Sequence, residues 1–246
     1  MAPRTLAGVM APVVTTFDGS GAVAPGPFVS NARRHLEAGL AGLVVAGSTG
    51  EAALLDEDER GVLVEAVRPV VAADRWLIVG VGAESTRLTI RRARLAAERG
   101  ADAVLVVAPH YYGAAAMTPA ALRAHYRQVA DESPVPVVLY NIPKYMHFAL
   151  PAELVAELAA HENVIGIKDS SGDLAMLEGF LAARSESFAV LTGNGGQLLP
   201  AMERGAAGGI LAVALFAVDD STGGNLAAIQ HQMIRTGRKD AAARAG

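Results

Sequence analysis

Lysine is scarce in this chain, and one of its three lysines ends an apolar run. Lys144, Lys168 and Lys239 stand against 18 arginines among the 246 residues, and Lys168 directly follows the apolar residues 164–167. A lysine at a strand end often extends its ammonium group into water. Lysine also has a property that arginine lacks, because a desolvated lysine can lose its proton and attack a carbonyl. Its position alone leaves both interpretations open.

Two further groups suited to carbonyl chemistry follow other apolar runs. Residues 47–51, with the sequence Gly-Ser-Thr-Gly-Glu, precede an expected helix, where backbone N–H groups favour an anion such as a carboxylate. An ordinary turn with a Ser or Thr helix cap explains them equally well. Tyr140 ends another run, and a buried tyrosine usually finds one hydrogen-bond partner. Its phenol can also relay protons if Ser48 or Tyr112 completes a chain of hydroxyls.

A lysine, a phenol and an anion-binding turn gathered at one place describe a Schiff-base lyase. Lys168 would form an imine with a 2-oxo acid, and the imine would accept electrons from the adjacent C–C bond. Ser48 and Thr49 would hold the substrate carboxylate, and Tyr140 would move a proton to or from the C4 hydroxyl. We expect no external cofactor, since lysine supplies the electrophile.

The histidines and the absence of cysteine argue against metal and thiolate chemistry. None of the six histidines has the spacing of a His-x-His or His-Glu-x-x-His motif, so a metal-dependent aldolase is disfavoured. His110 and His147 fall near the expected site, where they could contact substrate. Without cysteine there is no thiolate nucleophile, no Cys-based zinc site and no disulfide.

Short apolar runs alternate with longer helical segments along the chain. The runs are continuous in Val, Ile and Leu, which is typical of parallel strands covered on both faces. We expect strands at about 6–14, 42–47, 76–82, 103–109, 136–143, 164–169, 189–194 and 208–214. Between them, Asp56 and Ser85 mark helix starts, and Pro119 and Pro151 suit first helical positions.

Eight β/α units fit a (β/α)₈ barrel better than a doubly wound sheet. A doubly wound nucleotide-binding fold would carry Gly-x-Gly-x-x-Gly after its first strand, and residues 15–21 lack that spacing. In a barrel the polar residues at the strand ends share one mouth, where chemistry collects. We predict an α/β catalytic barrel over residues 1–218, followed at 219–246 by the eighth helix and the start of a C-terminal helical region.

Composition and charge exclude several classes of partner. The apolar fraction of 52% is ample for a large core, and the net charge of −4 gives no electrostatic case for nucleic acid or an anionic membrane. The N-terminus lacks the apolar core of a signal peptide, and no apolar stretch reaches the length of a membrane span. The expected location is the cytoplasm.

Four motifs at the expected strand ends resemble the dihydrodipicolinate synthase / N-acetylneuraminate lyase family of class I aldolases. They occupy residues 47–51, 109–112, 140–143 and 166–169, and the resemblance extends over about residues 5–214. It implies a single barrel, pyruvate as one substrate, an imine at Lys168 and no metal. It also implies that Tyr140 is the acid/base residue.

The resemblance implies roles for further residues. Ser48 and Thr49, in the turn that begins at Gly47, would contact the carboxylate, and Ile210 matches a backbone contact near bound pyruvate. The residue matching Tyr112 often enters the site of a neighbouring subunit. A dimer, often paired into a tetramer, is therefore expected.

Some positions depart from the family pattern. True dihydrodipicolinate synthases usually carry a carboxylate-binding arginine where this chain has Tyr145, with Lys144 beside it, and a phenol is no substitute for a bidentate guanidinium. Positions that resemble the lysine-feedback site also differ, so feedback inhibition by lysine is not expected: Ala52, Glu57, Arg60, Glu84 and Leu88. Family members usually continue beyond the barrel, and that C-terminal helical region is largely missing here.

Other stretches look more like 4-hydroxy-2-oxoglutarate aldolases, namely residues 82–86, 117–126, 129–140 and 168–170. We therefore expect an enzyme that cleaves or forms a 4-hydroxy-2-oxo acid. The alternative is dihydrodipicolinate synthase proper, which condenses pyruvate with aspartate semialdehyde, and a lesser one is an inactive 2-oxo-acid-binding protein. The side chains expected to contact the aldehyde half include Tyr145, His147, Ser170, Asn194 and Leu215.

Overall fold

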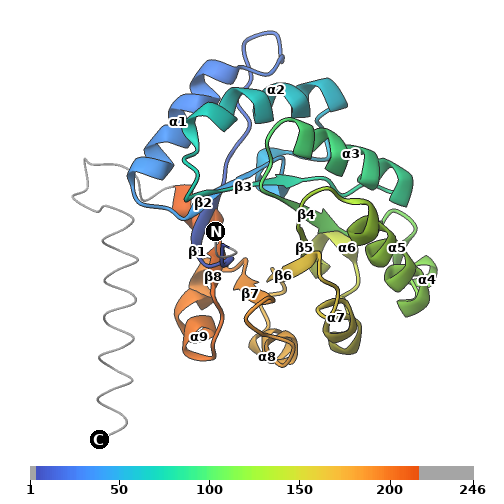
Figure 1. The fold of residues 1–246 in the computed structure, drawn as a ribbon. Helices are drawn as coiled ribbons and strands as arrows, with labels where there is room; N and C mark the ends of the chain where they lie inside the picture. Colours follow the sequence, from blue (N-terminus) through green and yellow to red (C-terminus); the bar gives the residue numbers. More distant parts are fainter. Residues whose placement is uncertain (1–3, 216–246) are drawn as a thin grey trace, which may run out of the picture.

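Eight parallel strands pair side by side in chain order and close into a barrel (Figure 1). The computed structural model describes residues 4–215. The barrel closes where β8 pairs with β1, with Gly208 opposite Gly8. The (β/α)₈ fold predicted from the sequence is therefore confirmed, and the doubly wound alternative is excluded because the sheet has no open edge.

All eight predicted strands form; β6 has the predicted bounds, and each of the others is somewhat shorter than predicted. They are β1 (Gly8–Pro12), β2 (Gly42–Val45), β3 (Trp76–Gly80), β4 (Ala103–Val107), β5 (Val137–Asn141), β6 (Val164–Asp169), β7 (Ala189–Thr192) and β8 (Gly208–Ile210). The prediction that the last strand extends to residue 214 is wrong. The chain leaves the sheet after Ile210, and Ala212–Leu215 form the 3₁₀ turn η4.

Helices cover the outside of the barrel (Figure 1). They are α1 (Pro25–Glu37), α2 (Glu57–Val67), α3 (Thr86–Glu98), α4 (Gly113–Ala116), α5 (Pro119–Glu132), α6 (Pro143–Met146), α7 (Ala152–Leu158), α8 (Leu174–Leu181) and α9 (Leu198–Glu203). Three further 3₁₀ turns are η1 (Ser48–Gly50), η2 (Arg68–Val70) and η3 (Gly195–Gln197).

The predicted helix starts have a physical basis in their caps. Asp56 and Glu59 form a reciprocal capping box at α2, and the Ser85 side chain accepts a hydrogen bond from Leu88 N at α3. Pro119 occupies the first turn of α5, as predicted. Pro151 instead precedes α7 as its N-cap residue, one position earlier than predicted.

The strands are buried on both faces, which explains why their sequences are continuous apolar runs. Leu43, Val44 and Val45 of β2 are each 0% exposed, although neighbouring side chains on a strand point to opposite faces. Within residues 4–215, no helix has both the length and the apolarity needed to cross a bilayer. The predicted boundary at residue 218 and the predicted eighth helix lie outside the described residues, so both stay predictions.

One buried histidine between α3 and α5 gives a prediction for acid stability. His125 is 5% exposed, its Nδ1 lies 3.0 Å from Thr86 Oγ1, and its Nε2 meets no partner among the described residues. Burial lowers the pKa of His125 to about 4, and the charge of Glu84 offsets this only in part.

The unfolded chain takes up a proton at this histidine near its ordinary pKa of about 6.5, whereas the folded chain does so only near pH 4. Folding stability therefore falls as the pH drops through this window, by up to about 3 kcal/mol. Between about pH 7 and about pH 4.5, the free energy of unfolding should fall in both proteins. We expect it to fall by about 2 kcal/mol less in His125→Gln than in the wild type. Urea unfolding at the two pH values measures this, and an equal loss in both proteins would contradict it.

Candidate active site

The pairing of β5 with β6 brings Tyr140 and Lys168 together at the barrel mouth. Tyr140 lies opposite Lys168 in the register of the two strands, and the Lys168 Nζ atom is 4.3 Å from the centroid of the Tyr140 ring. The two side chains are 5% and 6% exposed, respectively. Both stand at the C-terminal ends of parallel strands, where barrel chemistry collects. The structure thus brings together the two residues that the sequence predicts as catalytic.

The surroundings of Lys168 differ from those of an edge lysine that reaches into water. None of the ion pairs within residues 4–215 involves Lys168, and the face of the Tyr140 ring is the cation–π partner of its amine. No salt bridge has to break before Nζ can reach a carbonyl carbon. A buried, unpaired amine beside a phenol fits the nucleophile of an imine-forming site.

A second pair, Asn141 and Asp169, stands directly after the first and was missed from the sequence. The Asn141 Nδ2 donates to Asp169 Oδ1 at 2.7 Å, and the Ser171 hydroxyl donates to Asp169 Oδ2 at 2.7 Å. The Leu150 N–H donates to Asn141 Oδ1 at 2.9 Å. Burial raises the pKa of Asp169. The sequence does carry a signal for this pair, because a polar residue directly follows each predicted catalytic residue: Asn141 follows Tyr140, and Asp169 follows Lys168.

Gly193, directly after β7, leaves the space that the Lys168 side chain crosses. A Cβ atom at this position would lie 2.9 Å from Lys168 Cε and 1.9 Å from Ser170 Oγ. Real Cβ atoms do not approach other heavy atoms so closely, so Ser170 and Lys168 would both have to move. Gly193 is a second candidate site position that was missed from the sequence, because the need for a glycine here depends on the path of the Lys168 side chain.

The turn at residues 47–51 is a tight structure separate from the helix that follows it. Both Gly50 N and Ala52 N donate to Gly47 O, at 3.0 and 3.2 Å, within and after η1. The Asp56 side chain, and neither Ser48 nor Thr49, caps α2. The hypothesis that these hydroxyls merely cap the helix is therefore wrong. Ser48 is exposed and Thr49 half-buried, so both hydroxyls stand near the mouth.

The backbone on either side of this turn is held in an uncommon conformation. Ala46 has φ 51° and Glu51 has φ 58°, both in the left-handed region that non-glycine residues rarely adopt. Such positions cost free energy and concentrate at ligand-binding sites. The turn has the hydroxyls, the donors and the strain of an anion-binding segment.

The other predicted substrate contacts surround the mouth at several strand ends. Ile210 is buried at the end of β8, and Ser170 is half-buried beside Gly193. The Asn194 side chain accepts a hydrogen bond from Gly196 N at 3.0 Å, so its oxygen already serves the turn η3. Tyr145 on α6 is 48% exposed, with the Lys144 amine 5.4 Å from its ring centroid.

A cavity of about 720 Å³ opens beside the mouth. Ser48 and Tyr145 line it together with His110, whereas Lys168 and Tyr140 do not. His147 is exposed, and its backbone ends α6 in the left-handed region with φ 63°. Among the described residues, no three His, Asp or Glu side chains gather as potential metal ligands.

Tyr112 does not join the other predicted catalytic residues within one chain. Tyr111 and Tyr112 are each 78% exposed and pack edge to face, with ring centroids 5.1 Å apart. Within residues 4–215 no hydrogen bond connects Tyr112, Ser48 and Tyr140, so the predicted chain of hydroxyls is not formed by a single copy. The physical reason lies in the backbone, because the Glu84 carboxylate accepts hydrogen bonds from the N–H groups of His110 and Tyr111, both at 2.9 Å.

Gly193→Ala tests whether this glycine positions Lys168. The added methyl group would displace the lysine, and misplacement of a reacting atom by about 1 Å can cost about 100-fold in rate. We expect borohydride trapping of a pyruvate adduct at Lys168 to slow by about this factor. Gly196→Ala is the matched control, because its Cβ would meet nothing closer than 3.5 Å. Equal trapping rates in the two variants would contradict the assignment.

Known proteins resemble this chain in sequence and in fold. The Dihydrodipicolinate synthetase family matches residues 5–233. A 4-hydroxy-tetrahydrodipicolinate synthase of Xanthomonas axonopodis pv. citri (strain 306) is 39% identical over 241 residues, which is 97% of this chain and 76% of that protein. The enzyme of the same name from Stenotrophomonas maltophilia (strain K279a) is 41% identical over 192 residues, or 78% of this chain and 64% of that protein.

A solved structure gives the same result. The prophage protein YagE of E. coli K12, a dihydrodipicolinic acid synthase family member in complex with pyruvate, is 30% identical with a TM-score of 0.81. The alignment covers 86% of this chain and 72% of that one, so this chain is the shorter in each comparison. On the match over residues 5–233, the chain belongs to the dihydrodipicolinate synthase / N-acetylneuraminate lyase family of class I aldolases.

Proposed function

We propose that the protein is a Schiff-base lyase that joins or cleaves pyruvate and an aldehyde through an imine at Lys168. The observation that carries this proposal is the buried lysine amine 4.3 Å from the Tyr140 ring, with no ion pair among the described residues. The pyruvate held by the related YagE supports the choice of 2-oxo acid.

The reaction follows from groups that the chain itself supplies. The Lys168 amine attacks the C2 carbon of pyruvate, and loss of water from the carbinolamine gives the imine. A proton leaves C3, the resulting enamine carbon attacks the aldehyde, and Tyr140 returns that proton to the new alkoxide. Water then hydrolyses the imine and releases Lys168. Cleavage runs through the same steps in reverse.

The remaining contacts orient the pyruvate half. In this proposal the turn of Gly47, Ser48 and Thr49 holds the carboxylate, since it places two hydroxyls that can donate hydrogen bonds at the mouth. The Ile210 backbone borders the same end of the barrel from β8. No external cofactor takes part in this proposal, because the lysine imine withdraws the electrons.

For the aldehyde, the relatives support the alternative better than the aldolase favoured from the sequence. Two relatives at 39% and 41% identity are 4-hydroxy-tetrahydrodipicolinate synthases, so condensation of pyruvate with aspartate semialdehyde is our first candidate. Lys144, whose amine lies 5.4 Å from the Tyr145 ring centroid, is our candidate cation for the carboxylate of that aldehyde.

A second candidate, cleavage of a 4-hydroxy-2-oxo acid, rests on Tyr145. This half-exposed phenol lines the cavity where synthases usually carry a bidentate arginine, and it cannot make the same pair of hydrogen bonds. Contacts from Ser170 and Asn194 to the aldehyde half belong to either candidate.

The proposal also includes the association of two or more copies of this chain. Tyr111 and Tyr112 are each 78% exposed and pack edge to face, and two adjoining exposed aromatic rings are typical of a contact surface. We propose that a second copy covers them and that Tyr112 serves the partner's site, in a dimer or tetramer. The cytoplasmic location expected from the sequence is also part of this proposal.

Trapping of the imine tests the proposed chemistry. With pyruvate and borohydride, mass spectrometry should find a reduced pyruvyl adduct on the peptide that holds Lys168. Lys144 and Lys239 are the two other lysines of the chain and serve as internal controls that stay unmodified. Tyr140→Phe should keep the adduct while turnover falls by about 10²- to 10⁴-fold. An unmodified Lys168, or equal modification of all three lysines, would rule out the proposal.

An assay with two substrates separates the candidate functions. A coupled assay should detect condensation of pyruvate with aspartate semialdehyde, and Lys144→Met should raise the KM for the semialdehyde by about tenfold, the loss of one charge-assisted hydrogen bond. Activity confined to the retro-aldol cleavage of 4-hydroxy-2-oxo acids would favour the second candidate. A pyruvyl adduct without turnover of either substrate would identify an inactive 2-oxo-acid-binding protein.

A further inference from the structure

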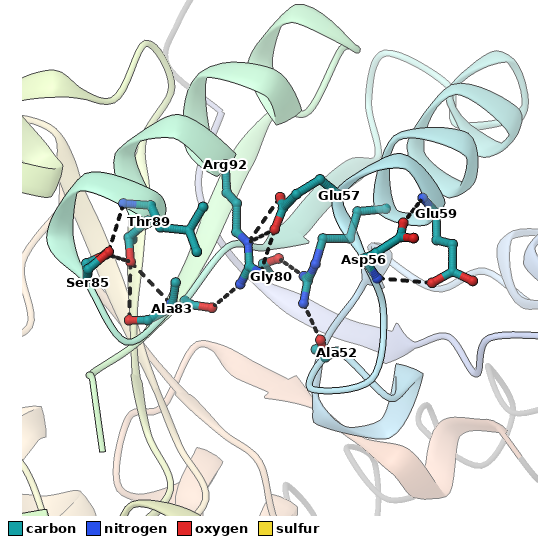
Figure 2. Close-up of polar contacts among 12 residues, drawn as sticks. Ala52, Asp56, Glu57, Glu59, Gly80, Ala83, Ser85, Thr89 and Arg92 are labelled. Carbon is teal, nitrogen blue, oxygen red and sulfur yellow. Dashed lines mark hydrogen bonds and ion pairs between the residues drawn. The ribbon is translucent and has the colours of Figure 1, made fainter. Parts of the chain in front are cut away.

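Two arginines from neighbouring helices, Arg60 of α2 and Arg92 of α3, line the cavity beside the barrel mouth, and Figure 2 shows Arg92 with its partner Glu57. Arg92 of α3 donates to Glu57 through Nε at 2.9 Å and Nη2 at 2.6 Å, and its Nη1 donates to Gly82 O at 2.8 Å. Glu57 lies in the first turn of α2, and Arg60 follows one turn later. The carboxylate of Glu57 is therefore already engaged by Arg92.

Arg60 is buried without an ion pair of its own among residues 4–215. It is 8% exposed, its Nη1 donates to Gly80 O at 3.1 Å, and its Nη2 donates to Ala52 O. Its Nε is buried and has no partner in the described part of the chain. Burial and the neighbouring Arg92 lower the pKa of Arg60 to about 10, so the guanidinium stays charged at neutral pH.

Arg60 binds two carbonyls that border the turn at residues 47–51. One belongs to Ala52, directly after the turn, and the other belongs to Gly80, at the end of the neighbouring strand β3. Ala52 follows the anion-binding turn, and its N–H also donates to Gly47 O at 3.2 Å. Gly80 ends β3, and a Cβ atom there would lie 2.0 Å from Ala46 O, so β3 packs directly against the start of the turn. Arg60 therefore connects the end of the turn to the strand on which its start rests.

This turn needs an external hold because its backbone is strained at both ends. Left-handed Ala46 and Glu51 each cost on the order of 1–3 kcal/mol and persist only where the surroundings over-determine them. Thr15 supplies one hold from the other side, since its hydroxyl donates to Gly50 O at 2.6 Å. The two hydrogen bonds of Arg60 hold the turn from the second side. Burying the guanidinium costs free energy that an apolar side chain at this position would not cost.

We propose that Arg60 is a positioning residue, whose hydrogen bonds to Ala52 O and Gly80 O hold the Ser48-Thr49 turn in its carboxylate-binding shape. This inference rests on the proposed function, because it assigns the turn to the pyruvate carboxylate. Tyr140 and Lys168 stand on β5 and β6, respectively, outside the contacts of Arg60. Loss of the guanidinium therefore weakens substrate binding and leaves the chemical step largely intact.

Arg60→Met and Arg92→Met form a matched pair of variants. Both remove one guanidinium from the same cluster, but only Arg60 binds Ala52, the residue that directly follows the turn. We expect Arg60→Met to raise the KM for pyruvate by about tenfold or more, with kcat reduced less than about threefold, whereas Arg92→Met leaves this KM within about twofold. Arg60→Lys keeps the charge but loses the planar fork, so it should give an intermediate KM.

Hydrogen exchange provides a readout that does not depend on activity. The amides of Gly50, Glu51 and Ala52 are hydrogen-bonded within the turn, so Arg60→Met should exchange them at least about tenfold faster than Arg92→Met does. Arg60→Lys, should Arg60→Met not fold, gives the same comparison with a smaller increase.

Two results would overturn the inference: an equal rise in KM for both methionine variants, or unchanged exchange in the turn accompanied by a lower melting temperature. Either would make Arg60 a residue that stabilises the fold alone. A wild-type protein that forms no pyruvyl adduct would refute the proposed function instead. In that case the exchange rates would still decide whether Arg60 holds the turn.

Discussion

The hydrogen-bonded register between β5 and β6 is the constraint on which the site depends. It sets Tyr140 opposite Lys168, and since side chains on a strand alternate between two faces, a slip of one residue would turn one of them away. The Asn141–Asp169 hydrogen bond, one residue further along, secures the same register from the opposite face of the strands. The geometry of the reacting pair is therefore a property of two buried strands and needs no ordering of a loop.

The rest of the mouth divides into a rigid half and a variable half. Gly193 leaves room for the Lys168 side chain, and we propose that Thr15 and Arg60 hold the turn at residues 47–51 from two sides. These contacts serve the 2-oxo acid, which our proposal shares between both candidate reactions. Tyr145 stands instead on the short helix α6, half-exposed at the cavity, so a change of aldehyde requires no change in the strands.

The parts of the structure that could be predicted from the sequence are those that local pattern determines. Continuous apolar runs predict all eight strands, and the polar residues that end them predict that Lys168 and Tyr140 meet. The hydroxyl chain through Tyr112 could not be judged in this way, because the preceding backbone N–H groups of His110 and Tyr111 donate to the carboxylate of Glu84, 26 and 27 residues earlier. Gly193 and Arg60 were missed as site residues for a related reason. Gly193 leaves room for the side chain of Lys168, and Arg60 binds the carbonyls of Ala52 and Gly80. Neither contact can be read from local sequence, because the partners are not neighbours in the chain.

A crystal structure of the protein soaked with pyruvate would show whether Lys168 forms the imine. We expect continuous density from the Lys168 Nζ to the C2 atom of pyruvate, with the carboxylate within hydrogen-bond distance of residues 47–51 and the Tyr140 hydroxyl facing the new bond. Pyruvate bound without a covalent bond to Lys168, or with its carboxylate away from that turn, would contradict the account.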